Sequence, residues 1–538
     1  MQKNMTNTRQ HISDWFSRTA ERANPILVKE TRQSLKGRQF VATFMLLLMA
    51  SWIISAAYAI NAPEAIEYGA VAMDLFFAFY VVLAFAVLVV VPLGAFLSLS
   101  SENQENTFDL LSITTLKPGQ IVRGKLASTS VQMLVYYSAI APFMAFTALL
   151  DGFDFACCVF LLGITMLACV SASMLALMMA AVLQHRRLQS LSGMFWLLAV
   201  LGGLLSLFSS FVGLAADLTR TSLVLYSAEF WSVTGSLCLA TVSYVFLVQQ
   251  IAASQLTFES DNRSSGIRFT ASVQVGLYLL ALYLLMTYLR PALSSQDVLV
   301  FCILLELHLL AIGFFQVTAA NRMSRRVLRN LPANRLRRLL WIPFLPGGHR
   351  GFLWVVLNLA AIPLLVTIIP VTRSSNWNQI VDAIWASVAY VVIFLGFAAV
   401  LTGWVLRKFP QSRAAHVRVI LIIFCAGCLI LPYMPLLLGL RNSYGTYNPL
   451  EILNPFATVY TIAEENESFD FLVLLLGSIA CVMLVINARV LFSESRQIVN
   501  DQLQPTGLQA TGPGVTQSVA AGHDVTGEPP ASATEESP

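Results

Sequence analysis

Long runs of apolar residues alternate with short polar segments along almost the whole chain. Each run approaches the ~20 residues that a helix needs to cross the hydrocarbon core of a bilayer. Because unpaired backbone groups are costly in lipid, a run of this length predicts a helix. About twelve spans are predicted by this rule, at 40–60, 71–97, 126–150, 155–183, 191–214, 230–253, 269–289, 298–320, 352–371, 380–406, 417–440 and 469–492. The expected fold class is therefore an all-α polytopic membrane protein.

The composition agrees with lipid as the main solvent. Of the 538 residues, 57% are hydrophobic and 12% are charged, whereas soluble domains carry roughly 25% charged residues. So few charges cannot cover a globular surface. The formal net charge of +4 is therefore not a nucleic-acid signal, and we expect the lipid membrane, not nucleic acid, as a partner.

The placement of basic residues predicts the orientation of the chain. With the N-terminus in the cytoplasm, four of the 33 Lys and Arg residues fall on outer loops and the other 29 on inner segments. This asymmetry is a strong positive-inside signal. It predicts cytoplasmic N- and C-termini and an even number of spans. A secretory signal peptide is not expected, since residues 1–39 are polar and lack a short apolar core.

Four regions follow from this pattern. Residues 1–23 form a polar cytoplasmic arm, and residues 24–255 hold the first six predicted spans. Residues 256–500 form a second six-span half. The tail, residues 501–538, has no Lys or Arg and is rich in Gly, Pro, Ser and Thr, so we expect it to be disordered.

A basic amphipathic helix is predicted just before the first span, in "NPILVKETRQSLKGR" (24–38). Asn24 is a good N-cap, Pro25 suits the first helical position, and Gly37 permits a turn. At 100° per residue one side carries Leu27, Val28, Thr31, Ser34 and Leu35, and the other carries Lys29, Arg32, Gln33 and Lys36. Such a helix suits the membrane interface. The simpler alternative is an ordinary charged flank.

A second polar segment, "SSENQENTFDLLSITTLKPGQIVRGK" (100–125), lies between two predicted spans. Ser100 or Ser101 can cap a short cytoplasmic helix, and Lys117-Pro118-Gly119 would end it. Phe108 and Leu111 form an apolar strip that needs a covering surface. That surface is either a partner protein or the chain's own membrane domain.

The end of this segment also fits G-x-x-x-x-G-K, from Gly119 to Lys125. A phosphate-binding loop needs Ser or Thr next and a strand before it. Here Leu126 follows and a Pro-Gly turn precedes. Nucleotide binding by this chain is therefore not expected.

The two polar segments, in this order, resemble the elbow helix and the coupling helix of ABC-2 type permeases, the membrane subunits of ABC transporters. The family pattern is close to "SE-x-E-GT-x-D-L-L-x-TPL-x-x-x-x-I-v-x-GK". This chain departs from it at Asn106, where Gly is usual, and at Thr115, where Pro is common. The resemblance covers about residues 20–255; residues 256–500 repeat neither pattern.

The resemblance implies a permease that performs no covalent chemistry and binds no cofactor. The permease would lie in a bacterial cytoplasmic (inner) membrane. ATP and Mg²⁺ would be bound by a separate, dimeric ABC ATPase, and a second permease chain could pair with this one. The expected direction of transport is export. The implied ATPase-docking residues are Glu102, Glu105, Thr107, Phe108, Asp109, Leu110, Leu111 and Thr114. The implied elbow-helix residues are Asn24, Pro25, Lys29, Glu30, Arg32 and Lys36.

Glu306 stands out in the second half because it falls near the middle of the predicted span 298–320. A carboxylate at the bilayer centre costs about 2.5–3.5 kcal/mol on insertion scales, so it usually faces a cavity or a partner. It is a candidate for the translocation path, or else a neutral Glu bonded across a helix contact. His308 lies about 200° around the helix, so the two are not expected to pair.

Three other features have simpler explanations. Seven arginines at 321–338 fit lipid headgroups, an ATPase contact or plain topology anchoring. The loop 441–468 predicts a short outer helix, as a lid or as loop packing. The eight cysteines, including the CxxC of Cys425 and Cys428, fall in or beside apolar runs and predict packing residues.

Two other functional classes compete with the permease. A secondary transporter would need buried coupling residues and broken helices in both halves, and Glu306 is the main feature in its favour. A lipid- or polysaccharide-processing membrane enzyme would need clustered polar residues on large outer loops. The outer loops here are short and nearly free of such clusters. The substrate does not follow from the sequence.

Overall fold

The computed structural model describes residues 25–61, 72–104, 117–148, 155–183, 227–258, 260–288, 294–319, 323–329, 331–332, 334–368, 377–437, 447, 449–464 and 470–503. Within these ranges every regular element is a helix, which confirms the all-α class. Ten of these helices are long and apolar enough to cross a membrane. The chain therefore has the build of a multi-pass helical membrane protein.

The ten helices coincide with ten of the twelve predicted spans. They are Arg38–Asn61, Asp74–Glu102, Cys158–Val182, Phe230–Gln255, Ser265–Thr287, Ser295–Val317, Gly348–Ile368, Trp377–Lys408, Ala414–Tyr433 and Asp470–Glu494. The predicted span 126–150 forms a helix too, as part of α8, but it is not among the ten. The span 191–214 lies outside the described residues. The total of twelve remains a prediction.

The chain begins with α2 (Pro25–Lys36) and continues, after a bend at Gly37, into α3 (Arg38–Asn61). The next span consists of α5 (Ala72–Phe85), the π-helical turn η1 (Ala86–Val90) and α6 (Val91–Gln104). The π turn lies directly before Pro92, which cannot donate a backbone hydrogen bond and whose ring collides with the preceding turn. Widening that turn accommodates the proline.

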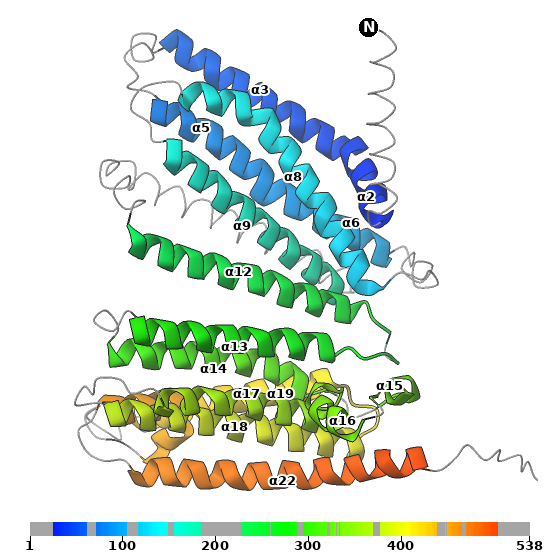
Figure 1. The fold of residues 1–538 in the computed structure, drawn as a ribbon, viewed down its shortest axis with the longest axis vertical. Helices are drawn as coiled ribbons and strands as arrows, with labels where there is room; N and C mark the ends of the chain where they lie inside the picture. Colours follow the sequence, from blue (N-terminus) through cyan, green and yellow to red (C-terminus); the bar gives the residue numbers. More distant parts are fainter. Residues whose placement is uncertain are drawn as a thin grey trace, which may run out of the picture. The chain divides into compact units, whose positions relative to one another are not determined.

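Three further helices complete the first group: α8 (Pro118–Ala148), α9 (Phe155–Val182) and α12 (Ala228–Gln255). In Figure 1, α3, α5, α8 and α9 run beside one another. Helix α5 contacts α3 and α8, and α8 contacts α9. Their shared core contains Leu47, Phe79, Leu83, Tyr136 and Ile140, all almost fully buried. A smaller apolar cluster joins α6, α9 and α12.

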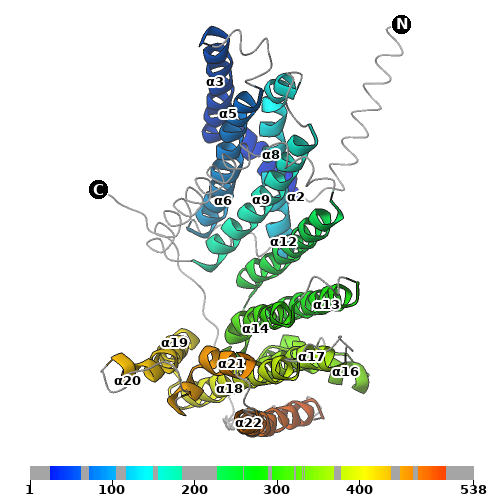
Figure 2. The same cartoon turned by 90° about the vertical axis from the view of Figure 1, so that its left-hand side faces the viewer.

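The second group begins with α13 (Ser265–Tyr288), α14 (Ser295–Val317), α15 (Arg325–Arg329), α16 (Arg335–Trp341) and η2 (Ile342–Phe344). It continues through α17 (Gly348–Ile368), α18 (Trp377–Lys408), α19 (Ala414–Ile430), η3 (Leu431–Tyr433), α20 (Met434–Leu437), η4 (Pro449–Leu453), α21 (Pro455–Glu464) and α22 (Asp470–Leu503). Helix α18 contacts α14, α17, α19 and α21, an arrangement visible in Figure 2. It is the most enclosed helix of this group, since 67% of its apolar stretch is buried.

Candidate functional site

Helix α2 has the two faces that the sequence predicted. Lys29, Arg32 and Lys36 are exposed, while Ile26 is buried and Glu30 faces inward at 9% exposure. Pro25 is the first residue of the helix, and Asn24 lies outside the described residues. The amphipathic helix is confirmed, whereas its position in a membrane interface remains a prediction.

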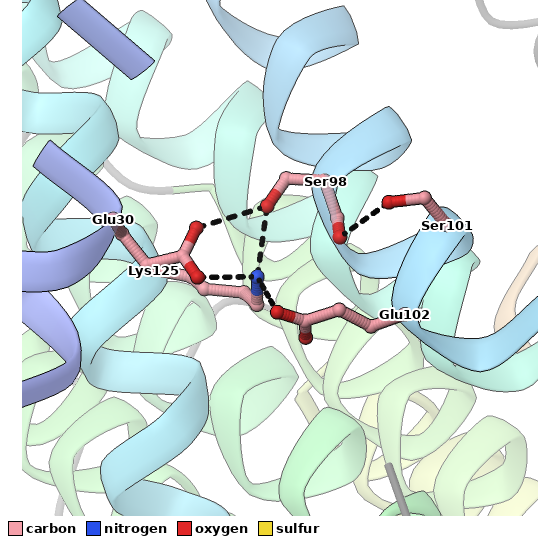
Figure 3. A network of polar contacts seen from close by, with 5 residues as sticks. All are labelled: Glu30, Ser98, Ser101, Glu102 and Lys125. Atoms are coloured by element: carbon pink, nitrogen blue, oxygen red, sulfur yellow. Dashed lines mark hydrogen bonds and ion pairs between the residues drawn. The ribbon is translucent and has the colours of Figure 1, made fainter. Parts of the chain in front are cut away.

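A buried polar network ties α2 to the ends of two long helices (Figure 3). The Lys125 ammonium of α8 lies 3.2 Å from Glu30 Oε1 of α2 and 3.0 Å from Glu102 Oε1 of α6. It also donates to Ser98 Oγ at 2.8 Å, and this hydroxyl donates to Glu30 Oε2 at 3.1 Å. The Lys125 side chain is only 3% exposed. One cation thus links three helices, and the network carries one excess negative charge.

A polar hollow of about 630 Å³ surrounds this network. Besides the charged groups it is lined by hydroxyl and amide side chains of α6 and α8, including Ser128, Thr129 and Gln132. These groups give the charged side chains a more polar environment than lipid, which lowers the cost of burying them. The hollow therefore explains how three charges persist between apolar helices.

One local prediction was wrong. Ser100 or Ser101 was expected to cap a separate helix after the second predicted span. Both residues, and Glu102 after them, lie in the last turns of α6, which continues to Gln104. A carboxylate near a helix C-terminus is disfavoured by the helix dipole. Lys125 offsets that disadvantage, and no local sequence pattern indicated this contact.

Glu105, Thr107, Phe108, Asp109, Leu110, Leu111 and Thr114 lie outside the described residues. The chain re-enters the described part at Lys117, and Pro118 starts α8. The stretch that fits G-x-x-x-x-G-K is therefore helical, not a loop, and its Lys125 is held by two carboxylates.

Glu306 lies inside the second group of helices and is 3% exposed. Its Oε1 is 3.0 Å from the hydroxyl of Ser387 on α18. His308 faces elsewhere: its Nδ1 is 2.8 Å from the hydroxyl of Tyr244 on α12. The prediction that Glu306 and His308 do not pair is confirmed, and the sequence did not reveal Ser387 as the partner.

The loop predicted to hold a short outer helix forms α21. Asn454 caps it, since its Oδ1 accepts from the backbone N–H groups of Phe456 and Ala457, and Pro455 occupies the first helical position. Near its end, Glu464 hydrogen-bonds to Tyr460 and raises the pKa of that phenol. Helix α21 packs on α18, which brings Glu464 into the same part of the fold as Glu306.

The arginine-rich segment forms α15 and α16. Arg326 pairs with Asp261 at 2.9 Å across an exposed surface, a contact worth little in free energy. The described cysteines, including Cys425 and Cys428, are free thiols. In the described part of the chain, no three His, Cys, Asp or Glu residues are grouped to hold a metal ion.

Comparison with models of protein families, with curated proteins and with solved structures finds no match for this chain. Function is therefore inferred from the residues and their geometry.

Proposed function

We propose that this chain is the membrane-spanning permease subunit of an ATP-driven ABC transporter in a bacterial cytoplasmic membrane. A separate, dimeric ATPase would dock on residues 102–114, bind ATP and Mg²⁺, and drive export through the spans. The chain itself would catalyse no covalent reaction.

The observation that supports this proposal most directly is the network around Lys125. Glu102 and Lys125 flank the polar segment that resembles a coupling helix, and Glu30 belongs to the helix that resembles an elbow helix. A partner that pushes on this segment would act on both of its ends. Because Lys125 connects them to α2, the displacement would reach the spans and the amphipathic helix together.

Docking is expected to use the apolar strip of Phe108 and Leu111 in a groove of the ATPase. Helix-in-groove recognition places apolar anchors three or four residues apart, which matches this spacing. Two Asp substitutions at these positions would put charge into the groove, where desolvation makes it costly.

The test is affinity purification of the tagged full chain in mild detergent, followed by mass spectrometry of copurifying proteins. We expect a soluble protein with a complete G-x-x-x-x-G-K-[ST] loop to accompany the chain and to be lost with Phe108→Asp plus Leu111→Asp. The matched control is Leu450→Asp plus Leu453→Asp, since these side chains of η4 are 40% and 38% exposed and belong to the predicted outer loop, away from a cytoplasmic ATPase. Retention of the ATPase by the first variant, or its absence from the intact chain, would contradict the proposal.

The buried Glu306 favours a second candidate, a secondary transporter driven by an ion gradient. Vesicles that contain the chain alone distinguish the two. Substrate movement that follows an imposed proton gradient without ATP and is lost with Glu306→Gln would favour the second candidate. A requirement for the ATPase and ATP would favour the first.

A further inference from the structure

An apolar cavity of about 480 Å³ lies beside Glu306, in the second group of helices. It is lined by residues of α14, α18, α19 and α21, and small-molecule pockets typically measure roughly 300–1,000 Å³. Most of the lining is aliphatic or aromatic, including Leu299, Ile303, Val391, Phe394, Phe456 and Val459. The cavity thus has the size and the walls of a site for a lipophilic small molecule.

The charges that line this cavity have one sign. Glu306 contributes a carboxylate from the middle of α14, and Glu464 contributes another from the end of α21. The described lining residues include no Lys, Arg or His. Glu306 is almost fully buried, and surroundings of low dielectric strengthen the attraction between its ionised form and a positive group. A nearby positive group also favours that ionised form. Glu464 lies at the exposed end of α21 and contributes less.

The carboxylate of Glu306 also lacks a dedicated hydrogen-bond donor. The Ser387 hydroxyl lies 3.0 Å from Glu306 Oε1 but also 2.9 Å from the carbonyl oxygen of Ile384. A hydroxyl has one hydrogen to donate, so the two acceptors share it. Among the described residues we find no other hydrogen-bond partner for this carboxylate, although Glu306 is 3% exposed. A bound cation would stabilise the carboxylate in place of the hydrogen-bond donors that it lacks.

We propose that this cavity binds a lipophilic cation, an organic molecule that carries a positive centre on an apolar body, with the positive centre beside Glu306. The apolar body would pack against the aliphatic walls. The rings of Tyr390, Phe394 and Phe456, which line the same space, add cation–π attraction. A neutral lipid chain would fill the volume without using the carboxylate, and an anion would be repelled.

Binding at this cavity needs no ATPase, although the assignment of the cation as exported cargo rests on the proposed function. The binding measurement therefore uses the full chain alone in lipid nanodiscs. Failure to bind the cation would contradict the binding proposal but not the proposed ATPase docking. Failure to copurify an ATPase would contradict the docking but not the binding proposal.

The probe is radiolabelled tetraphenylphosphonium, measured by equilibrium dialysis against empty nanodiscs to subtract partition into lipid. Tetraphenylborate, with the same shape and the opposite charge, is measured in separate samples as a second radiolabelled ligand, because the two ions associate with each other in solution. We expect saturable binding of the phosphonium by the intact chain, at least about tenfold weaker binding by Glu306→Gln because a charge-assisted contact is lost, and no saturable binding of the borate. Glu306→Gln keeps the side-chain shape and the contact with Ser387, so the variant should fold.

Two variants sharpen the test. Glu451→Gln removes a neighbouring carboxylate that does not line the cavity and should bind the probe normally. Val459→Phe fills the cavity from α21 and should abolish binding without changing charge. The proposal is overturned if the intact chain does not bind the phosphonium, if Glu306→Gln binds it as tightly, if Glu451→Gln is equally weakened, or if the intact chain binds the borate equally well.

Discussion

At the scale of single residues, the ammonium group of Lys125 is the shared partner of two carboxylates in a largely buried setting. The Glu30 and Glu102 side chains are 11% and 16% exposed, and Lys125 is 3% exposed. Buried ion pairs gain little net free energy, but removing one partner leaves an uncompensated charge. The network therefore specifies how three helices meet more than it stabilises them.

Replacing Lys125 with Met should destabilise the chain by about 3–5 kcal/mol, because two carboxylates then face each other without a cation. The triple variant Glu30→Gln, Glu102→Gln and Lys125→Met removes all three charges and should recover most of that loss. Thermal unfolding of the purified chain in detergent, followed by circular dichroism, measures both effects.

Arg123→Met is the matched control, since Arg123 is an exposed residue on the same helix. It should change stability by less than about 0.5 kcal/mol, as is usual for surface substitutions. If Lys125→Met were as stable as Arg123→Met, the network would have no structural role.

At the scale of elements, the junction between α13, α14 and α17 depends on a buried arginine. The Arg268 guanidinium donates to Gln316 Oε1 at 3.0 Å and to the carbonyl oxygens of Pro343, Leu345 and Gly347 at 2.8, 2.5 and 3.1 Å. These contacts provide hydrogen-bond donors for backbone carbonyl groups of the segment 343–347, which leads into α17. Backbone groups without such partners are costly inside an apolar domain.

Gly351, in the first turn of α17, permits this close approach. A Cβ atom there would lie 2.7 Å from the carbonyl oxygen of Gln316 and 3.0 Å from Arg268 Nη2. Gly351→Ala should therefore destabilise the chain by about 1–3 kcal/mol, the usual cost of overpacking. The same thermal unfolding measurement checks it.

Gly427→Ala in α19 provides the comparison, because an added Cβ there meets no atom within 4 Å. Alanine favours a helix over glycine by roughly 1 kcal/mol, so this variant should be neutral or slightly more stable. Equal stability of the two variants would show that α17 can shift away from α14 at little cost.

At the scale of the whole molecule, large parts of the exposed helix surface are apolar, as contact with lipid requires. In α3, 17% of the apolar stretch is buried, and Met49, Trp52 and Ile53 are 63%, 68% and 62% exposed. Helices α12, α19 and α22 show the same low share of buried residues. Such apolar surface is uncommon on soluble monomers and indicates contact with a bilayer.

The predicted orientation can be tested by single cysteine substitutions and a maleimide that does not cross membranes. Ser374→Cys, on a predicted outer loop, should be labelled in intact cells. Thr6→Cys and Ser518→Cys, on the predicted cytoplasmic termini, should be labelled only after permeabilisation, because positive segments stay inside. The unsubstituted chain controls for its own cysteines, and the reverse labelling pattern would contradict the predicted topology.

The sequence alone determined the all-helical class, the positions of ten spans, the two faces of α2 and the short helix α21. These features follow from local patterns, since span length, helical periodicity and an Asn-Pro cap are set by neighbouring residues. The sequence also predicted that Glu306 and His308 do not pair, because helix geometry fixes the angle between nearby side chains.

Only the tertiary structure decided which distant side chains meet. Lys125 lies 95 residues from Glu30 in the chain, and Ser387 lies 81 residues from Glu306, so no periodicity links them. The prediction of a helix capped at Ser100 or Ser101 was wrong for the same reason. The serines are good helix caps, but α6 continues past them. The ammonium group of Lys125, from α8, stabilises the Glu102 carboxylate in that continuation. The cavity beside Glu306 likewise exists only because four helices pack around one carboxylate.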